Sequence, residues 1–371
     1  MSKRKKAVLT GIAAILVLAV ALGLLQELLR PKYGYGNIPE GTLIADYYDE
    51  AGDHDVIFIG DCEVYENFSP ITLWEEQGIT SYIRGSAQQL IWQSYYLLED
   101  TLRYETPDVV VFNVLSMQYG EPQSEAYNRL NLDGMRLSAS KIKAVLASMT
   151  EEESFWSYLF PLLRYHDRWS ELTARDVTGM FQTEELSHNG FLMRVDVRAA
   201  ENIPNPRPLG NYDFADVCWE YLEKMADLCE ERGIELILIK APSLYPHWYD
   251  EWDAQIAAWA EEKGLRYLNF LSMTDTIGLD FSTDTYDGGL HLNLAGAEKL
   301  SSWFGEYLAE EVGLTGHRGE EALEALWQAK CDRYYAMEAD QLRELEEYGY
   351  LKSYGARAPE ETSHKVIIYD Y

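Results

Sequence analysis

"VIFIGDCEVYENFSP", residues 56–70, begins with the apolar run of a β-strand and turns at Gly60-Asp61. Cys62 follows directly, at the point where the chain is expected to begin a helix. In open α/β sheets, ligands bind outside the carboxyl ends of the strands, where turns of this kind lie. The stretch therefore predicts a strand, a turn and a helix in succession, and it makes Cys62 a candidate functional residue.

Further strand-like and helical segments alternate along the chain. Four more apolar stretches of strand length lie at 80–84, 109–114, 235–240 and 266–270. Amphipathic helical patterns lie at 86–104, 213–232 and 250–263. Near-continuous apolar strands are typical of strands covered on both faces, and their alternation with helices favours parallel pairing. We therefore predict a three-layer α/β/α sandwich around a mainly parallel five-stranded sheet.

Two intervals depart from this alternation. Residues 117–212 hold helical runs such as "SASKIKAVLASM" and then a long polar loop, and we interpret them as an inserted helical cap. Residues 316–371 are predicted to form a C-terminal helical appendage, and their tail, "SHKVIIYDY", is either frayed or an added edge strand. The α/β domain, cap included, then occupies residues 33–315.

Residues 1–32 have the composition of a membrane segment. Four basic residues at positions 3–6 precede the uncharged run Ala7–Leu25, which spans about 28 Å as a helix and so about one bilayer core. The basic flank should stay cytoplasmic and send the C-terminal bulk across the membrane. A cleavable signal peptide is the alternative, because Ala19-Val20-Ala21 imitates a cleavage site. We favour an uncleaved single-pass anchor in the cell membrane, since apolar residues continue beyond that site.

The rest of the chain is strongly acidic. Residues 1–32 hold six of the 31 Lys and Arg residues and one of the 62 Asp and Glu residues, so the remainder carries 25 basic and 61 acidic residues, a net charge of −36. Such a field repels polyanions, although salt screens it within about 8 Å. The composition therefore argues against nucleic acid as a partner and agrees with a soluble extracytoplasmic domain.

The four cysteines are far apart and show no metal-binding spacing. Cys218 and Cys229 lie eleven residues apart in one helical pattern, which separates them by about 16 Å along the axis and excludes a disulfide between them. Both are interpreted as small core residues. No metal site is predicted, because the His and Cys residues form no close cluster.

Polar or small residues follow three of the predicted strands. The strand ends are Gly60-Asp61-Cys62, Arg84-Gly85-Ser86 and Phe112-Asn113-Val114. A fourth element, "TDTYDGGLHLNLAGAEKLS" (283–301), places His291 in a Gly-rich loop before a helix. Because the carboxyl ends of parallel strands meet at one edge of a sheet, these residues should converge on one crevice.

In these blocks the sequence resembles the SGNH (GDSL-like) hydrolase superfamily over roughly residues 52–116 and 230–312. It is also similar to the membrane-anchored extracytoplasmic branch, which includes the D-alanine transfer protein and polysaccharide acetylation proteins. The resemblance implies a flavodoxin-like fold, with Cys62 as nucleophile, His291 as general base, and Gly85 and Asn113 in the oxyanion hole. It implies no cofactor.

The chain departs from the family pattern at two positions. The nucleophile is cysteine instead of serine, and the acidic residue nearest to His291 is Asp287, four residues before it instead of three. The Gly-Gly loop between them would let Asp287 reach the imidazole, so we expect Asp287 to orient His291. Asp284 is the second choice.

The residues also support acyl chemistry by themselves. A nucleophile, a base and oxyanion donors within about 3 Å of one another suffice for acyl transfer. Cys62 at a helix N-terminus and near a histidine is expected to have a lowered pKa and a useful thiolate fraction at neutral pH. A thioester is itself an activated acyl donor, which suits transfer as well as hydrolysis. For a cysteine taken alone, a small buried residue is the commoner role.

Other candidates have weaker support. Lys240 ends the fourth predicted strand and is a candidate contact for a substrate anion, with a surface lysine as the alternative. His166, His188 and His247 lie in cap or loop stretches and are interpreted as surface or packing histidines.

Together these features predict an extracytoplasmic SGNH-like esterase or acyltransferase that acts on acyl groups of cell-envelope carbohydrate or polymer. Its partners would be an acylated glycan or polymer, the membrane through the N-terminal helix, and in one version a membrane-bound acyltransferase. The alternative is a non-catalytic envelope binding or assembly protein, because a fold does not fix a function.

Overall fold

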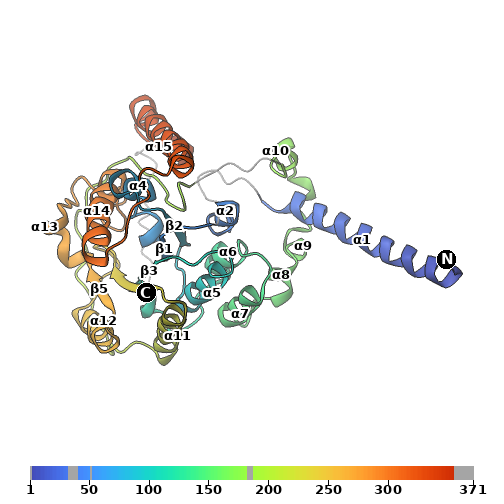
Figure 1. Cartoon of the computed structure of the whole chain (residues 1–371), viewed down its shortest axis with the longest axis horizontal. Helices are drawn as coiled ribbons and strands as arrows, with labels where there is room; N and C mark the ends of the chain where they lie inside the picture. Colours follow the sequence, from blue (N-terminus) through green and yellow to red (C-terminus); the bar gives the residue numbers. More distant parts are fainter. Residues whose placement is uncertain (1, 32–40, 51, 182–186, 355–371) are drawn as a thin grey trace. The chain divides into compact units, whose positions relative to one another are not determined.

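The computed structural model describes residues 2–31, 41–50, 52–181 and 187–354, and Figure 1 shows its helices and strands. The chain divides into two compact units, residues 1–34 with 151–184 and residues 35–150 with 185–371. The predicted tail "SHKVIIYDY" lies outside the described residues.

The larger unit is built on a five-stranded parallel sheet in the order β2-β1-β3-β4-β5. Its strands are β1 (Val56–Gly60), β2 (Ser81–Gly85), β3 (Val109–Asn113), β4 (Glu235–Lys240) and β5 (Arg266–Asn269). All five predicted strands are confirmed to within a residue at each end. The buried apolar runs of β1, β3 and β4 explain much of this agreement, because strands covered on both faces are rich in apolar side chains.

Helices cover both faces of the sheet. Alternate side chains of β1 point in opposite directions, so Val56 and Phe58 enter one apolar cluster while Ile57 and Ile59 enter the other. The first cluster is covered by α4 (Pro70–Gln77), α14 (Leu294–Tyr307) and α15 (Glu321–Tyr348). The second is covered by α5 (Ile91–Thr101), α11 (Asp216–Arg232) and α12 (Asp250–Lys263). The predicted three-layer α/β/α sandwich is therefore confirmed.

The remaining elements of this unit are short. Its other helices are α2 (Thr42–Glu50), α3 (Cys62–Tyr65), α6 (Glu125–Leu132), α7 (Ala139–Ser148) and α13 (Thr274–Ile277). Single 3-10 turns lie at Val114–Gln118, Phe270–Met273 and Lys352–Tyr354, and a π turn lies at Leu308–Val312.

The C-terminal helix α15 contributes to the core of the sandwich. Trp327, Cys331 and Tyr334 from one of its faces are buried in the first cluster. Trp327 stacks on Trp74 of α4 with ring centroids 5.1 Å apart. The helix predicted within 316–371 is thus present and packs on the sandwich with one apolar face.

The predicted cap interval is divided between the two units. Helices α6 and α7 belong to the sheet-bearing unit, and residues 151–184 belong to the other. Residues 187–200 return to the larger unit and bond to two segments near the predicted site: the Leu192 N–H donates to Tyr65 O at 2.8 Å, and the Arg198 N–H to Thr285 O at 2.9 Å. The domain boundaries proposed at residues 32, 117, 212 and 315 remain predictions.

The smaller unit contains α1 (Lys3–Leu29), α8 (Phe155–Leu159), α9 (Leu162–Tyr165) and α10 (Ala174–Thr178), with a 3-10 turn at Arg168–Ser170. Helix α1 has 27 residues and is long and apolar enough to cross a membrane. This helix is therefore compatible with the predicted anchor. A signal sequence would pass the same test of length and composition.

Candidate active site

The turn between β1 and α3 places Cys62 at the carboxyl end of the sheet. Asp61 caps α3, because its Oδ1 accepts the Glu63 backbone N–H at 3.1 Å. Gly85 lets α3 lie close to the strand ends, since a Cβ there would stand 3.0 Å from a Val64 methyl carbon and 3.1 Å from Gly60 O. A larger residue at Gly85 would therefore require its neighbours, the Val64 and Tyr65 side chains of α3 among them, to shift by a few tenths of an ångström.

Asp287, the predicted orienting acid, lies beside the imidazole of His291. Asp287 Oδ2 lies 2.7 Å from His291 Nδ1, and its Oδ1 accepts the His291 backbone N–H at 2.9 Å. Gly288 and Gly289 between them have φ angles of 91° and 103°, which favour glycine and allow the tight turn. Asp284 is engaged elsewhere, in an ion pair with Lys299 at 2.7 Å.

The thiol of Cys62 lies close enough to the imidazole of His291 for each group to affect the pKa of the other. The thiol and the imidazole interact electrostatically and through a thiol–imidazole contact. His291 Nε2 is buried and has no hydrogen bond of ordinary geometry to the described residues. Cys62 keeps part of its surface exposed. Cys62, His291 and Asp287 are therefore brought together, and their roles as nucleophile, base and orienting acid remain predictions.

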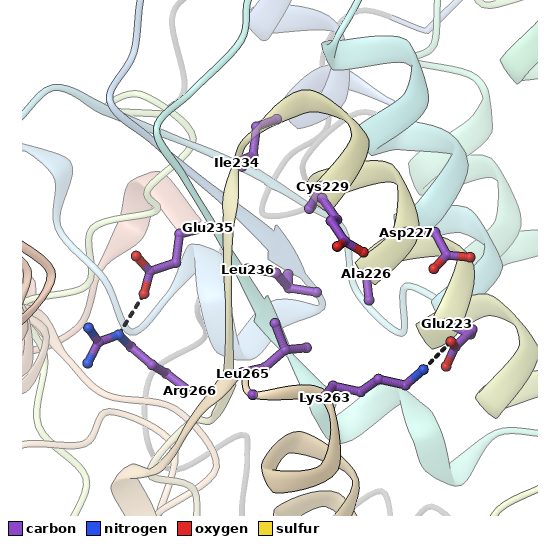
Figure 2. A pocket seen from close by; sticks show the side chains of 12 residues that line it. Glu223, Ala226, Asp227, Cys229, Ile234, Glu235, Leu236, Lys263, Leu265 and Arg266 are labelled. Carbon is purple, nitrogen blue, oxygen red and sulfur yellow. Dashed lines mark hydrogen bonds and ion pairs between the residues drawn. The ribbon is translucent and has the colours of Figure 1, made fainter.

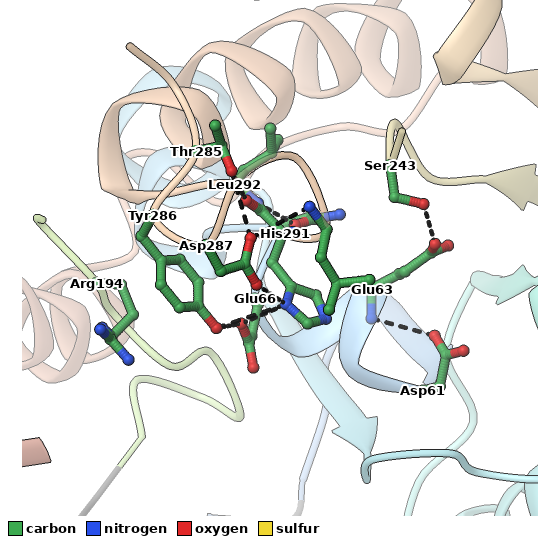
Figure 3. A network of polar contacts seen from close by, with 12 residues as sticks. Asp61, Glu63, Glu66, Arg194, Ser243, Thr285, Tyr286, Asp287, His291 and Leu292 are labelled. Carbon is green, nitrogen blue, oxygen red and sulfur yellow. Dashed lines mark hydrogen bonds and ion pairs between the residues drawn. The ribbon is translucent and has the colours of Figure 1, made fainter. Parts of the chain in front are cut away.

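A second carboxylate, Glu66, lies on the same side of His291 as Asp287. Its Oε2 is 3.3 Å from His291 Nδ1, and it accepts the hydroxyl of Tyr286. Figure 3 shows Tyr286, Asp287 and Glu66 gathered around the imidazole. Sequence reasoning missed Glu66, although its position four residues after Cys62 would have placed both on one face of a helix.

These contacts shift the pKa values of His291 and Cys62. Burial alone would lower the pKa of His291, but Glu66, Cys62 and Asp287 together raise it well above its usual value. Burial also raises the pKa of the Cys62 thiol to about 11, against the lowering effect of His291. The expectation of a useful thiolate fraction at neutral pH is therefore corrected. Helix α3 has only four residues, which is too short for a strong dipole. In addition, burial raises the pKa of the thiol by more than His291 lowers it.

A buried polar network lies beneath the nucleophile turn. The Lys240 ammonium donates to Glu63 Oε2 at 2.9 Å, to Ser243 Oγ at 2.9 Å and to Ala241 O at 2.6 Å. The Lys240 and Glu63 side chains are both 0% exposed. Figure 3 shows Glu63 between Ser243 and the turn that carries Asp61. Lys240 thus binds Glu63, and contact with a substrate would require the network to open.

Asn113 belongs to the same network. Its amide nitrogen donates to Asp61 Oδ1 at 3.1 Å and to Glu63 Oε2 at 2.9 Å, and its Oδ1 accepts the Ala241 N–H at 3.1 Å. Both amide hydrogens are therefore engaged by carboxylates in this structure. The oxyanion roles of Asn113 and Gly85 remain predictions, and the role of Asn113 would require one of these bonds to break.

Residues interpreted as packing or surface positions behave as predicted. His188 is buried edge-on against Tyr334, with ring centroids 5.1 Å apart, whereas His166 and His247 are exposed. Cys218 and Cys229 are buried free thiols. Among the described residues, no group of three or more His, Cys, Asp or Glu side chains could hold a metal ion.

A pocket of about 600 Å³ lies at the opposite edge of the sheet, near the starts of β4 and β5 (Figure 2). Its cations are paired with its carboxylates: Arg266 bonds Glu235 at 2.6 Å, and Lys263 bonds Glu223. Burial raises the pKa of its Cys229 thiol to about 12. The pocket therefore offers no ready nucleophile and lies away from the strand ends where α/β enzymes bind their substrates.

Comparison with known proteins does not identify a family. No protein-family model matches the chain, and no curated protein matches it. One similar solved structure is a crystal structure from Bacteroides fragilis, described as a putative acylhydrolase, which is 12% identical with a TM-score of 0.36. The match covers 76% of this chain and 99% of that chain. A likeness this distant carries no information about activity.

Alkylation of Cys62 by iodoacetamide is expected to accelerate about tenfold per pH unit between about pH 7 and pH 10. Only the thiolate reacts, and its fraction rises tenfold per unit below a pKa of about 11. Peptide mass spectrometry can follow Cys62 separately from the three buried cysteines. A rate that levels off near neutral pH would contradict the burial argument.

The Glu66→Gln variant should shift this alkylation profile toward lower pH, because it removes a carboxylate whose charge raises the pKa of the thiol. Glu298→Gln is a matched control, since Glu298 is a half-buried carboxylate bonded to Tyr334 and not to His291. Identical profiles for the wild-type protein and Glu66→Gln would show that Glu66 does not affect the pKa of the Cys62 thiol.

The Asp61→Asn variant should gain thermal stability relative to wild type as pH rises from about 4 to about 7. Burial, with the nearby Glu63 charge, raises the pKa of Asp61 from 3.8 to about 7 against the effect of Lys240. The folded state therefore holds this proton more tightly than the unfolded chain, and wild type loses stability as the proton leaves. Asparagine has no proton to lose. Melting temperatures in detergent across this range test the prediction, and a constant difference between the proteins would refute it.

Proposed function

We propose that this protein is a membrane-anchored, extracytoplasmic esterase or acyltransferase of SGNH type that uses Cys62 as its nucleophile. The observation that carries the proposal is the arrangement of Cys62, His291 and Asp287 at the carboxyl end of the sheet, with Asp287 Oδ2 2.7 Å from His291 Nδ1. This order of nucleophile, imidazole and acid is the one that acyl transfer requires.

The protonation of the site suggests how the reaction would begin. The raised pKa of His291 favours its imidazolium form, and the pKa of the Cys62 thiol, raised to about 11, favours the protonated thiol. Transfer of the thiol proton to water gives a thiolate beside an imidazolium. The thiolate sulfur bonds to the acyl carbonyl carbon, and the carbonyl oxygen takes up the electron pair. When that pair returns, the bond to the leaving alcohol breaks and His291 Nε2–H protonates the alcohol.

The second half of the reaction would regenerate the thiol. Neutral His291 accepts a proton from water or from an acceptor hydroxyl, whose oxygen attacks the thioester of Cys62. Sulfur then leaves as thiolate and takes a proton back from water, which restores the thiol. Attack by water gives hydrolysis, and attack by a sugar hydroxyl gives transfer. Among acceptors we favour neutral envelope glycans or polymers, because residues 33–371 carry a net charge of −36 and repel polyanions. A membrane-bound acyltransferase would be a suitable acyl source.

A second candidate function is a non-catalytic envelope binding or assembly protein. Two observations favour it: the thiol pKa is raised to about 11, and both Asn113 amide hydrogens are engaged by carboxylates. An Asn113→Ala variant would not separate the two functions, because it would also remove one hydrogen-bond donor from each of the Asp61 and Glu63 carboxylates.

The proposed chemistry predicts an acyl adduct on Cys62. The full-length protein in detergent, treated with p-nitrophenyl acetate at alkaline pH, should gain the mass of one acetyl group on the Cys62 peptide. Cys62→Ala should gain none, and His291→Ala should accumulate the adduct more slowly by a factor of about 100 or more, as expected for loss of acid–base help.

Asp284→Asn serves as a control, because Asp284 pairs with Lys299 and not with the imidazole. If folded protein with reduced Cys62 forms no adduct with several acyl donors, the binding function becomes the better explanation.

A further inference from the structure

Large apolar side chains are concentrated on the surface of residues 155–181 in the smaller unit. Among the residues that the structure describes, the exposed Trp and Phe side chains all lie here, and Leu and Val side chains accompany them. The set, with exposed fractions from 51% to 80%, is Trp156, Phe160, Leu163, Trp169, Val177 and Phe181. Soluble proteins rarely gather exposed aromatic residues in this way unless the surface meets a partner or a membrane.

This segment is held on the carboxyl end of α1. Helices α9 and α10 both contact α1, and Leu29 in its last turn is 0% exposed. Arg168 donates from its guanidinium to the Leu29 carbonyl oxygen at 2.5 Å and forms an ion pair with Asp176 at 3.3 Å. The Asp176 carboxylate also accepts the Thr173 N–H at 2.8 Å. A terminal helix carbonyl that water would otherwise solvate is thus satisfied by the segment.

The position of Leu29 along α1 gives the segment a depth relative to a bilayer. The uncharged run of α1 ends at Leu25, and four more residues add about 6 Å at the helical rise. The headgroup region on each side of the hydrocarbon core is about 5–8 Å thick. If α1 crosses the membrane, residues fixed to Leu29 lie at the height of the headgroups. Tryptophan and other amphipathic aromatic residues are enriched at that depth.

We propose that residues 155–181 form an aromatic collar, with Trp156, Phe160, Leu163, Trp169, Val177 and Phe181 inserted in the membrane interface around the exit of α1. The inference rests on the proposed anchoring of α1 and does not depend on the chemistry of Cys62. The occupant is the lipid interface of the leaflet at the carboxyl end of α1, because α9 and α10, which carry Leu163 and Val177, contact this apolar helix.

The charge of the collar indicates which part of the lipid it meets. Residues 151–181 contain three Arg and no Lys, against six Asp and Glu residues. A segment with a net negative charge is not attracted electrostatically to anionic headgroups. Binding must therefore come from burial of its aromatic and aliphatic side chains at the boundary between headgroups and acyl chains.

The absence of tryptophan from α1 makes the collar directly measurable. The full-length protein is placed in phosphatidylcholine nanodiscs whose acyl chains carry bromine near the headgroup, and tryptophan emission is compared with that in unbrominated nanodiscs. Helix α1 contains none of the ten tryptophans, so any quenching must arise from another segment. We expect quenching in the wild-type protein and its loss in the Trp156→Phe, Trp169→Phe double variant.

Two comparisons make the result decisive. Trp259→Phe, which removes a partly exposed tryptophan of α12 in the sheet-bearing unit, should keep the wild-type quenching. Co-elution of the protein with nanodiscs reports insertion of α1 independently of the collar. Protein that co-elutes without quenching, or quenching that survives in the double variant, would overturn the collar; the former would point to a protein partner on this surface. Failure to co-elute would overturn both the anchor and the collar.

Discussion

The candidate site depends on one buried ion pair, between Lys240 at the end of β4 and Glu63 in α3. Both side chains are 0% exposed and their charged atoms are 2.9 Å apart. A charge buried at this depth is strongly destabilising unless it is paired and fully hydrogen-bonded. Ser243 and Asn113 complete the bonding, so the ends of β3 and β4 and the helix that carries Cys62 are held as one unit.

The surroundings of Cys62 favour the protonated thiol. Burial raises the pKa of the thiol, and the nearby carboxylates of Asp61 and Glu66 raise it further, so these effects disfavour a thiolate. The positive charge of a protonated His291 opposes these effects, and the Asp287 and Glu66 carboxylates stabilise that charge. In the proposed function, such a site would keep Cys62 protonated at rest and would place a charged His291 to protonate the leaving group.

The candidate site and the proposed aromatic collar lie in different units of the chain. The sheet-bearing unit contains every residue of the candidate site, whereas residues 1–34 and 151–184 contain the apolar helix and the residues of the proposed collar. What the sequence suggests to be one inserted cap therefore consists of segments with different environments. Residues 187–200 lie along the site and are tied by the Leu192 and Arg198 amides to the nucleophile helix and to the loop that carries His291.

By itself, the sequence determined the five strands, the layer order and the placement of Cys62, Asn113 and His291 at strand ends or in a late loop. These features follow from local patterns, because buried parallel strands require continuous apolar runs and their ends converge at one edge. Only the tertiary structure decided that Glu66 joins Asp287 at the imidazole, that Lys240 holds Glu63, and that the thiol stays protonated. Those outcomes depend on burial and on contacts between distant segments, neither of which is encoded in the spacing of residues.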